Sequence, residues 1–236
     1  MKPLAKLAKR SPADPDAVLR PAAPAEAGSR VDEVYRQILA QIIRGELASG
    51  AELKSTQLAA SLGVSRTPVV QALARLIADG IVTQRMNMRA VVRPGAENWL
   101  IEVHELRLLL EPAAAARAAE RITEPALRQL EQQAAAVAPQ TEGWTKRARE
   151  FDFALHLSIA DHAGNQPMRD AIYKCWHYKQ LSYELGPDRP TSIVRGYEEH
   201  LTILEALKAG DAATASAAME LHLRLAGSYR PEGRVV

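Results

Sequence analysis

Residues 55–82 read STQLAASLGVSRTPVVQALARLIADGIV, and this pattern decides the fold of the first third of the chain. Ser55 is a suitable cap for a short helix, which Gly63 is expected to end in a tight turn. Ser65 is placed to cap a second helix, whose first turn tolerates Pro68. The apolar residues at helical spacing on this second helix are Val69, Leu73, Leu76 and Ile77. The stretch therefore predicts two short helices joined by a turn, a helix-turn-helix.

The residues on either side complete a small domain. Upstream, apolar residues recur at three and four positions over residues 31–43, which predicts an amphipathic helix. Downstream, Ile81-Val82 and residues 90–92 read as two short β-strands around a turn at residues 86–88. Three helices followed by a small β-hairpin predict a winged helix-turn-helix domain over residues 31–93.

Polar side chains cluster where the second helix of this motif begins. Ser65, Arg66 and Thr67 lie where the helix begins, and Gln71 lies on the face opposite its apolar residues, so all four are candidate DNA contacts. Arginine can bind guanine through two hydrogen bonds, and glutamine can bind adenine in the same way. Lys54, just before the supporting helix, is placed to contact a phosphate. Small helical hairpins also carry arginine at their ends for structural reasons, but the spacing and the hairpin favour DNA binding.

Outside residues 31–93, the sequence predicts a disordered arm, a short linker and a helical second domain. Residues 1–30 contain eight Ala and five Pro and are expected to form a disordered basic arm. Residues 94–96 contain the Pro-Gly pair of a linker, and residues 97–230 are expected to form the second domain. Its expected helices are residues 97–120, 124–138, 143–163, 167–185, 190–209 and 211–229. The predicted fold class is therefore mainly α: a winged helix-turn-helix followed by an all-α six-helix bundle.

Composition and charge exclude several classes of protein. The 236 residues carry a net charge of +2, made of +3 in residues 1–30, +3 in residues 31–95 and −4 in residues 96–236. The positive charge of residues 1–95 favours a polyanionic binding partner. No apolar run is long enough for a transmembrane helix, and the single Cys175 excludes an internal disulfide and a cysteine-based zinc site. No glycine-rich phosphate-binding loop is present. We expect a cytoplasmic protein without membrane contact.

Histidines on three predicted helices point to a metal site. Asp152 and His156 are four residues apart on one helix, so they share a face, and neighbouring residues make that face apolar. His200 and His222 lie on apolar faces of two later helices. A single buried histidine is usually a hydrogen-bonded core residue, whereas three with a carboxylate suit zinc, nickel or manganese. The residues alone leave both interpretations open.

The helix-turn-helix resembles a known family. GVSRTPVVQAL at residues 63–73, followed by the L-x-x-x-G-I-V pattern of residues 76–82, is similar to the GntR family of bacterial transcription regulators. The resemblance covers most of residues 31–93. It implies a winged-helix dimer on a pseudo-palindromic operator, with an effector domain behind it. It also implies DNA contacts by Lys54, Arg66, Thr67 and the wing residues 87–89, which include Asn87 and Arg89.

Two departures from the family pattern concern the DNA contacts. The family usually has arginine where this chain has Val70, and glutamate where it has Gln71. The wing usually carries Arg-Gly, where the aligned pair here is Met88-Arg89. Glycine allows the backbone to approach DNA closely, so Arg89 must contact DNA differently. The framework residues are intact, and we therefore expect an altered operator rather than a loss of DNA binding.

The second domain resembles the FCD effector domain of FadR-type GntR regulators. The segments that carry the likeness are DFALHLSIADHAGNQPM at residues 152–168, EEHLTILEALKAGDAATA at 198–215 and MELHL at 219–223. The resemblance implies that Asp152, His156, His200 and His222 bind one divalent metal ion, zinc, nickel or manganese. Six helices match the shorter, VanR-like branch. Members that bind acyl-CoA lack this constellation, which argues against a fatty acyl effector.

Two further residues are candidates for binding an effector. Arg107 lies in HELRLLLEPAAAA at residues 104–116, which is similar to the family's E-x-R-x-x-x-E stretch. By that resemblance Arg107 binds an effector carboxylate; the alternative is a surface ion pair with Glu111, four residues on. Asn165 could contact an effector, or could cap the next helix. Four aromatic residues could line the site or belong to the core: Trp176, His177, Tyr178 and Tyr183.

These observations predict a ligand-responsive bacterial transcription regulator that is not an enzyme. We expect it to act as a repressor, binding double-stranded operator DNA as a homodimer until a small organic acid binds at the metal. One alternative is a constitutive DNA-binding dimer with a purely structural metal. A metal-dependent hydrolase would also use Asp and His ligands, but no spare carboxylate is obviously placed as a general base. A metal-sensing regulator is a further alternative.

Overall fold

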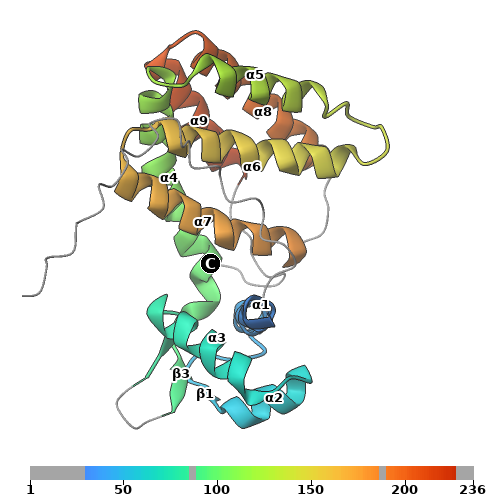
Figure 1. Ribbon diagram of the computed structural model, residues 1–236, viewed down its shortest axis with the longest axis vertical. Helices are drawn as coiled ribbons and strands as arrows, with labels where there is room; N and C mark the ends of the chain where they lie inside the picture. The colour runs from blue at the N-terminus through green and yellow to red at the C-terminus, as the bar shows by residue number, and fades with distance from the viewer. Residues whose placement is uncertain (1–29, 85–88, 186–189, 227–236) are drawn as a thin grey trace, which may run out of the picture.

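The computed structural model describes residues 30–84, 89–185 and 190–226. The helix-turn-helix region begins with α1 (Arg30–Arg44), α2 (Ser55–Leu62) and α3 (Arg66–Ala78). Figure 1 shows these helices and a small sheet at one end of the molecule, with the remaining helices stacked beyond them. The winged helix-turn-helix prediction is confirmed. Apart from Arg30, which starts α1, the predicted disordered arm lies outside the described residues.

The wing contains one more strand than the sequence predicted. Strands β1 (Glu52–Leu53), β2 (Val82–Thr83) and β3 (Ala90–Val92) form an antiparallel sheet in the order β1-β3-β2. The predicted pair of strands is present, although β2 begins one residue later than expected. Two residues are too few to show the alternation by which a strand is recognised, so β1 gave no signal in the sequence. The predicted turn at residues 86–88 lies outside the described residues.

The ends of α2 and α3 determine how the helix-turn-helix is closed. Gly63 ends α2 with a φ of 64°, a left-handed conformation that favours glycine. Ser65 has extended backbone in the cap position of α3, but its side chain makes no capping hydrogen bond. The prediction for Ser55 was wrong, because Lys54 occupies the cap position and Ser55 is the first residue of α2. Its hydroxyl is instead used by a residue of α3, described below.

Six helices form the rest of the described chain, as predicted. A short 3-10 turn at Ala96–Asn98 leads into the bundle, whose helices are α4 (Trp99–Ala119), α5 (Glu124–Ala135), α6 (Trp144–His162), α7 (Gln166–Leu185), α8 (Pro190–Lys208) and α9 (Ala212–Ala226). In Figure 1, α4 rises from the winged helix into the bundle, and α7 lies across the top of α1. None of the described helices is both long and apolar enough to cross a membrane.

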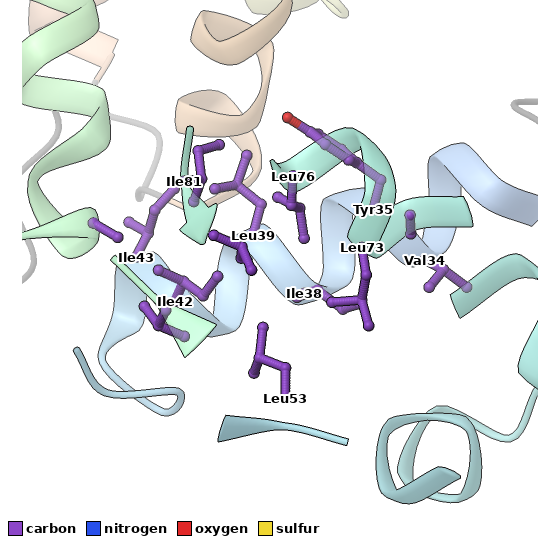
Figure 2. Close-up of a cluster of buried hydrophobic side chains, with 14 of the residues drawn as sticks. Val34, Tyr35, Ile38, Leu39, Ile42, Ile43, Leu53, Leu73, Leu76 and Ile81 are labelled. Atoms are coloured by element: carbon purple, nitrogen blue, oxygen red, sulfur yellow. The ribbon is translucent and has the colours of Figure 1, made fainter. Parts of the chain in front are cut away.

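The buried apolar residues form two clusters, and the first is shared between the two regions. It contains the apolar face of α1, including Tyr35 and Leu39, and the inner face of α3, including Leu76 (Figure 2). It also includes residues from the start of α4 and from α7, namely Leu100, Val103, Cys175, Tyr178 and Leu181. The second cluster fills the bundle around Phe151 and Trp176. The bundle therefore contacts the DNA-binding region through a common apolar core.

Replacing Leu76 by alanine should destabilise the protein strongly. Leu76 is completely buried in the first cluster, and removing a buried leucine side chain costs about 2–5 kcal/mol. Val70→Ala on the same helix is the matched control, since Val70 is 47% exposed and surface changes stay within about 0.5 kcal/mol. Urea unfolding followed by circular dichroism measures both. Equal losses of unfolding free energy in the two variants would contradict the assignment of these faces.

Candidate metal centre and DNA-binding surface

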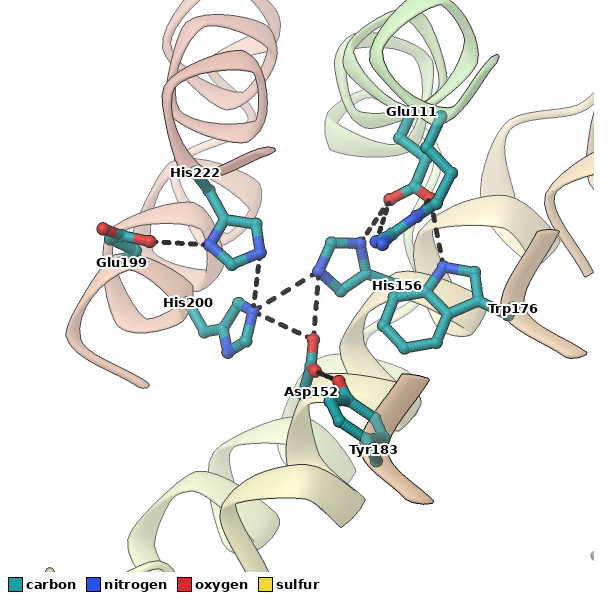
Figure 3. Close-up of polar contacts among 9 residues, drawn as sticks. Glu111, Asp152, His156, Trp176, Tyr183, Glu199, His200 and His222 are labelled. Atoms are coloured by element: carbon teal, nitrogen blue, oxygen red, sulfur yellow. Dashed lines mark hydrogen bonds and ion pairs between the residues drawn. The ribbon is translucent and has the colours of Figure 1, made fainter. Parts of the chain in front are cut away.

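Four ligand-type side chains converge inside the bundle. Asp152 and His156 come from one face of α6, His200 comes from α8, and His222 comes from α9. One potential ligand atom from each residue lies within 4.8 Å of every other. Figure 3 shows the three imidazole rings and the carboxylate turned toward a common point. The predicted set is thus brought together from three different helices.

The distances between these atoms fit a shared metal ion. The Nε2 atom of His200 is 3.1 Å from Nε2 of His222 and 3.4 Å from Nε2 of His156. Oδ1 of Asp152 lies 3.1 Å from Nε2 of His200 and 3.4 Å from Nε2 of His156. Ligand atoms of one metal ion lie about 3 Å apart because each is about 2 Å from it. Three imidazoles and a carboxylate suit zinc, nickel or manganese.

Carboxylates behind the rings orient two of the histidines. Nδ1 of His156 lies 2.5 Å from Oε2 of Glu111, and Nδ1 of His222 lies 2.8 Å from Oε2 of Glu199. A proton held on Nδ1 by a carboxylate leaves the lone pair of Nε2 free for a metal, an arrangement found in most histidine-metal sites. The phenol of Tyr183 donates a hydrogen bond to Oδ2 of Asp152, which leaves Oδ1 facing the rings.

The protonation of the site also fits metal binding. Burial lowers the pKa of His156, and burial together with the other two histidines lowers the pKa of His222 to about 2. Burial acts to raise the pKa of Asp152, but the neighbouring His200 and His156 hold that pKa well below its usual value. Neutral imidazole and ionised carboxylate are the forms that bind metals. At neutral pH these groups are therefore ready to act as ligands.

Arg107 lies beside this cluster in a buried ion pair. Nε and Nη2 of Arg107 donate to the two carboxylate oxygens of Glu111, at 2.5 and 3.3 Å. The expected alternative, a surface pair with Glu111, was right about the partner and wrong about the location, because both side chains are only 2–3% exposed. Trp176 completes the group: its Nε1 donates to Oε1 of Glu111, and its ring lies 4.4 Å from the guanidinium.

Asn165 does not join the cluster. Its Oδ1 accepts a hydrogen bond from the backbone N–H of Met168, so the side chain caps the start of α7. Asn165 precedes Trp176 by eleven residues, which corresponds to about 16 Å along a helix. The expected effector contact by Asn165 has no support in this geometry, and the alternative role in capping accounts for the residue.

The predicted DNA-contacting residues lie on one exposed surface. Arg66, Thr67 and Gln71 are exposed on α3, Ser65 is exposed directly before it, and Lys54 is partly exposed before α2. Nε of Arg66 donates to Oγ of Ser55 at 3.0 Å, which fixes the arginine beside the tip of α2. In the wing, Arg89 is exposed and forms an ion pair with Glu52 of β1. Asn87 lies outside the described residues.

Comparisons with known proteins agree with this architecture. The model of the bacterial regulatory proteins of the gntR family matches residues 30–92, and the FCD domain model matches residues 102–225. The chain belongs to the GntR family. It is 32% identical over 206 residues to the HTH-type transcriptional regulator LutR of Bacillus subtilis, covering 77% of this chain and 92% of LutR. This GntR protein is therefore a DNA-binding transcription regulator with an FCD domain.

Two other proteins are similar to this GntR regulator, one in part of its sequence and one in its fold. The Nta operon transcriptional regulator of Aminobacter aminovorans is 39% identical over 75 residues, which is 32% of this chain and 36% of that protein. The solved structure of Escherichia coli McbR/YncC matches with a TM-score of 0.57 at 24% identity, covering 84% of this chain and 94% of that one. This structural likeness concerns the fold alone.

Sequence reasoning missed three residues that support the candidate ligands of this GntR regulator. Glu111 was considered only as an ion-pair partner of Arg107, although it also contacts His156. Glu199 was not considered, because its position directly before His200 gives no hint that it contacts His222. Tyr183 was recognised as an aromatic residue near the site, but not as the donor to Asp152. Each contact joins helices that only the folded bundle brings together.

Replacing Glu199 by glutamine should weaken metal binding without abolishing it. Loss of the carboxylate behind a ligating histidine typically lowers metal affinity about 10- to 100-fold. Glu198→Gln is the matched control, because Glu198 is exposed and is the neighbouring residue. Competition with a chelating dye for zinc measures both affinities, and mass spectrometry should give about one equivalent for the wild type. Unchanged affinity in Glu199→Gln, or a wild type that binds no metal, would contradict the site.

Proposed function

We propose that this GntR regulator is a repressor that binds a pseudo-palindromic operator as a homodimer and is released by a small carboxylic acid bound at a metal ion. The observation that carries the proposal is the convergence of Asp152, His156, His200 and His222 next to the buried Arg107. The four residues would hold a divalent metal. When bound, the metal would supply an open coordination position for a carboxylate oxygen.

Arg107 has the donors to bind the same carboxylate. Its Nε and Nη2 are used by Glu111, but a guanidinium carries five N–H groups in a fixed plane. Nη1 and the second N–H of Nη2 are not used by Glu111. An acid bound at the metal could thus receive a charge-assisted hydrogen bond from Arg107. Glu111 would keep the arginine in place before and after the acid binds.

Helix α7 is suited to carry the effect of binding to the DNA-binding region. On one face, Trp176 contacts Glu111 and Tyr183 contacts Asp152. On another face, Tyr178 belongs to the core shared with α1, and its hydroxyl lies 3.4 Å from the hydroxyl of Tyr35. A movement of α7 caused by the effector would therefore shift α1 and α3. That shift changes the separation of two recognition helices, which must match about one turn of DNA, 34–36 Å.

The surface of the bundle supports pairing with a second copy. Four of the large hydrophobic residues that are exposed lie on α4 and α9, which pack against each other: Leu106, Leu109, Leu221 and Leu225. Exposed apolar patches usually mark protein interfaces. Covering them with the same face of a second copy would give a two-fold dimer, which matches the symmetry of a pseudo-palindromic operator.

Arg66→Ala should lose operator binding while leaving metal content unchanged. Arg66 opens the recognition helix, and a bidentate arginine contact to guanine contributes about 1–3 kcal/mol, or about 5- to 150-fold in affinity. Arg128→Ala is the control, because Arg128 is exposed on α5 and pairs only with Glu124 among the described residues. Fluorescence anisotropy with operator DNA selected by the wild type measures both. Equal affinity of the two variants would count against this recognition surface.

The release mechanism is tested by adding acids to the metal-loaded complex. A panel of two- to six-carbon carboxylic acids should contain at least one that lowers operator affinity, and only when metal is present. Arg107→Lys keeps the charge but loses the planar guanidinium group with its paired N–H donors. This variant should require a higher acid concentration for the same release from operator DNA. If no acid changes operator affinity although metal is bound, the metal is structural and the protein is a constitutive DNA-binding dimer.

A further inference from the structure

A second cation lies close to the candidate metal centre, and neither the four ligands nor Arg107 uses it. Lys179 is on α7, one turn before Tyr183, and its ammonium nitrogen lies 5.0 Å from the centre of the Tyr183 ring. The hydroxyl of that ring is bonded to Asp152. Lys179 therefore lies over the ring of a phenol whose hydroxyl contacts a candidate metal ligand.

Lys179 is partly buried and forms no ion pair with a carboxylate among the described residues. The two carboxylates that influence it most are Asp152 and Glu111. Asp152 is bonded to Tyr183 and faces two histidines, whereas Glu111 is shared by Arg107, His156 and Trp176. Burial lowers the pKa of Lys179 to about 8. An anionic partner from outside the chain would stabilise the charge of this partly buried ammonium.

The charged groups around the centre indicate which acid groups such a partner could use. Arg107, Arg149 and Lys179 are cations near the centre, and Glu111, Asp152 and Glu199 are carboxylates near it. A divalent metal would add two positive charges to this group. A ligand with two acid groups could offer one to the metal and Arg107 and the other to Lys179.

We propose that the effector carries two acid groups, one bound at the metal and Arg107 and the other bound by Lys179. This inference rests on the proposed function and specifies its ligand. The Tyr183 hydroxyl is bonded to the candidate ligand Asp152, and the ammonium of Lys179 lies over the ring of the same residue. A ligand that contacts both the metal and Lys179 would therefore need a second acid group beside the Tyr183 ring. The ligand class is a short dicarboxylic acid, or a carboxylic acid with a phosphonate or phosphate as its second group.

The test compares acids that differ only in the second charged group. Zinc-loaded full-length protein is titrated by calorimetry with malonate, succinate and glutarate, with propionate, butyrate and valerate as their single-acid counterparts. 3-Phosphonopropionate distinguishes a phosphonate from a carboxylate as the second group. A hydrogen bond to a charged group contributes about 1.5–3 kcal/mol, so at least one dianion should bind about 10- to 150-fold more tightly than its counterpart.

Variants of Lys179 assign that preference to this residue. Lys179→Met keeps the length of the side chain without the charge. In this variant the dianion and its single-acid counterpart should bind with nearly equal affinity, and the affinity for single acids should not change. Lys179→Arg restores a cation and should restore most of the preference. Lys146→Met is the control, because Lys146 is on α6 with a side chain 81% exposed. Zinc content and circular dichroism establish that each variant is folded and loaded.

The outcomes separate this inference from the proposed function. A preference for the dianion that is lost in Lys179→Met and kept in Lys146→Met supports it. If single and double acids bind the wild type equally, or if Lys179→Met keeps the preference, the role of Lys179 is wrong while an acid-responsive metal site remains. If none of the acids binds the loaded protein, the acid-binding site fails, and this inference fails with it.

Discussion

The buried carboxylate of Glu111 is the group on which the interior of the bundle depends. It accepts hydrogen bonds from Arg107 on its own helix and from Trp176 on α7, and it faces Nδ1 of His156 on α6. Burial acts to raise the pKa of Glu111, but Arg107 and His156 hold it far below its usual value. A buried charge is tolerated only when it is paired and hydrogen-bonded. One carboxylate thus fixes the position of three helices around the centre.

Helix α7 links the two parts of the molecule, because its side chains contact both the candidate metal centre and the end of α3. Trp176 and Tyr183 contact the centre, whereas Lys174 forms an ion pair with Asp79 at the end of α3, at 2.9 Å. Tyr35 of α1 donates to the same Asp79 at 2.6 Å. Because Asp79 is bonded from both sides, a rotation of α7 cannot occur without changing contacts at the end of the recognition helix.

The sequence was sufficient for features that repeat locally and insufficient for contacts between distant segments. The spacing of apolar residues and the glycines at helix ends predicted each described helix to within a few residues. The i, i+4 pair Asp152 and His156 predicted a shared face. The link from Glu199 to His222 spans 23 residues and depends on how α8 packs on α9, which no local pattern encodes. Strand β1 depends in the same way on its pairing with β3.

The placement of the candidate ligands supports the proposal that an effector, rather than the metal, would carry the signal. The four candidate ligands come from α6, α8 and α9, and none of these helices contributes a buried residue to the core shared with α1 and α3. A metal ion would therefore join three helices that contribute no described residue to that core. The groups around the ligands, Arg107, Glu111, Trp176 and Tyr183, come from α4 and α7, the two helices that do. A ligand that binds Arg107 would act on these two helices, and it shifts the equilibrium only by the difference in its affinity for the two arrangements.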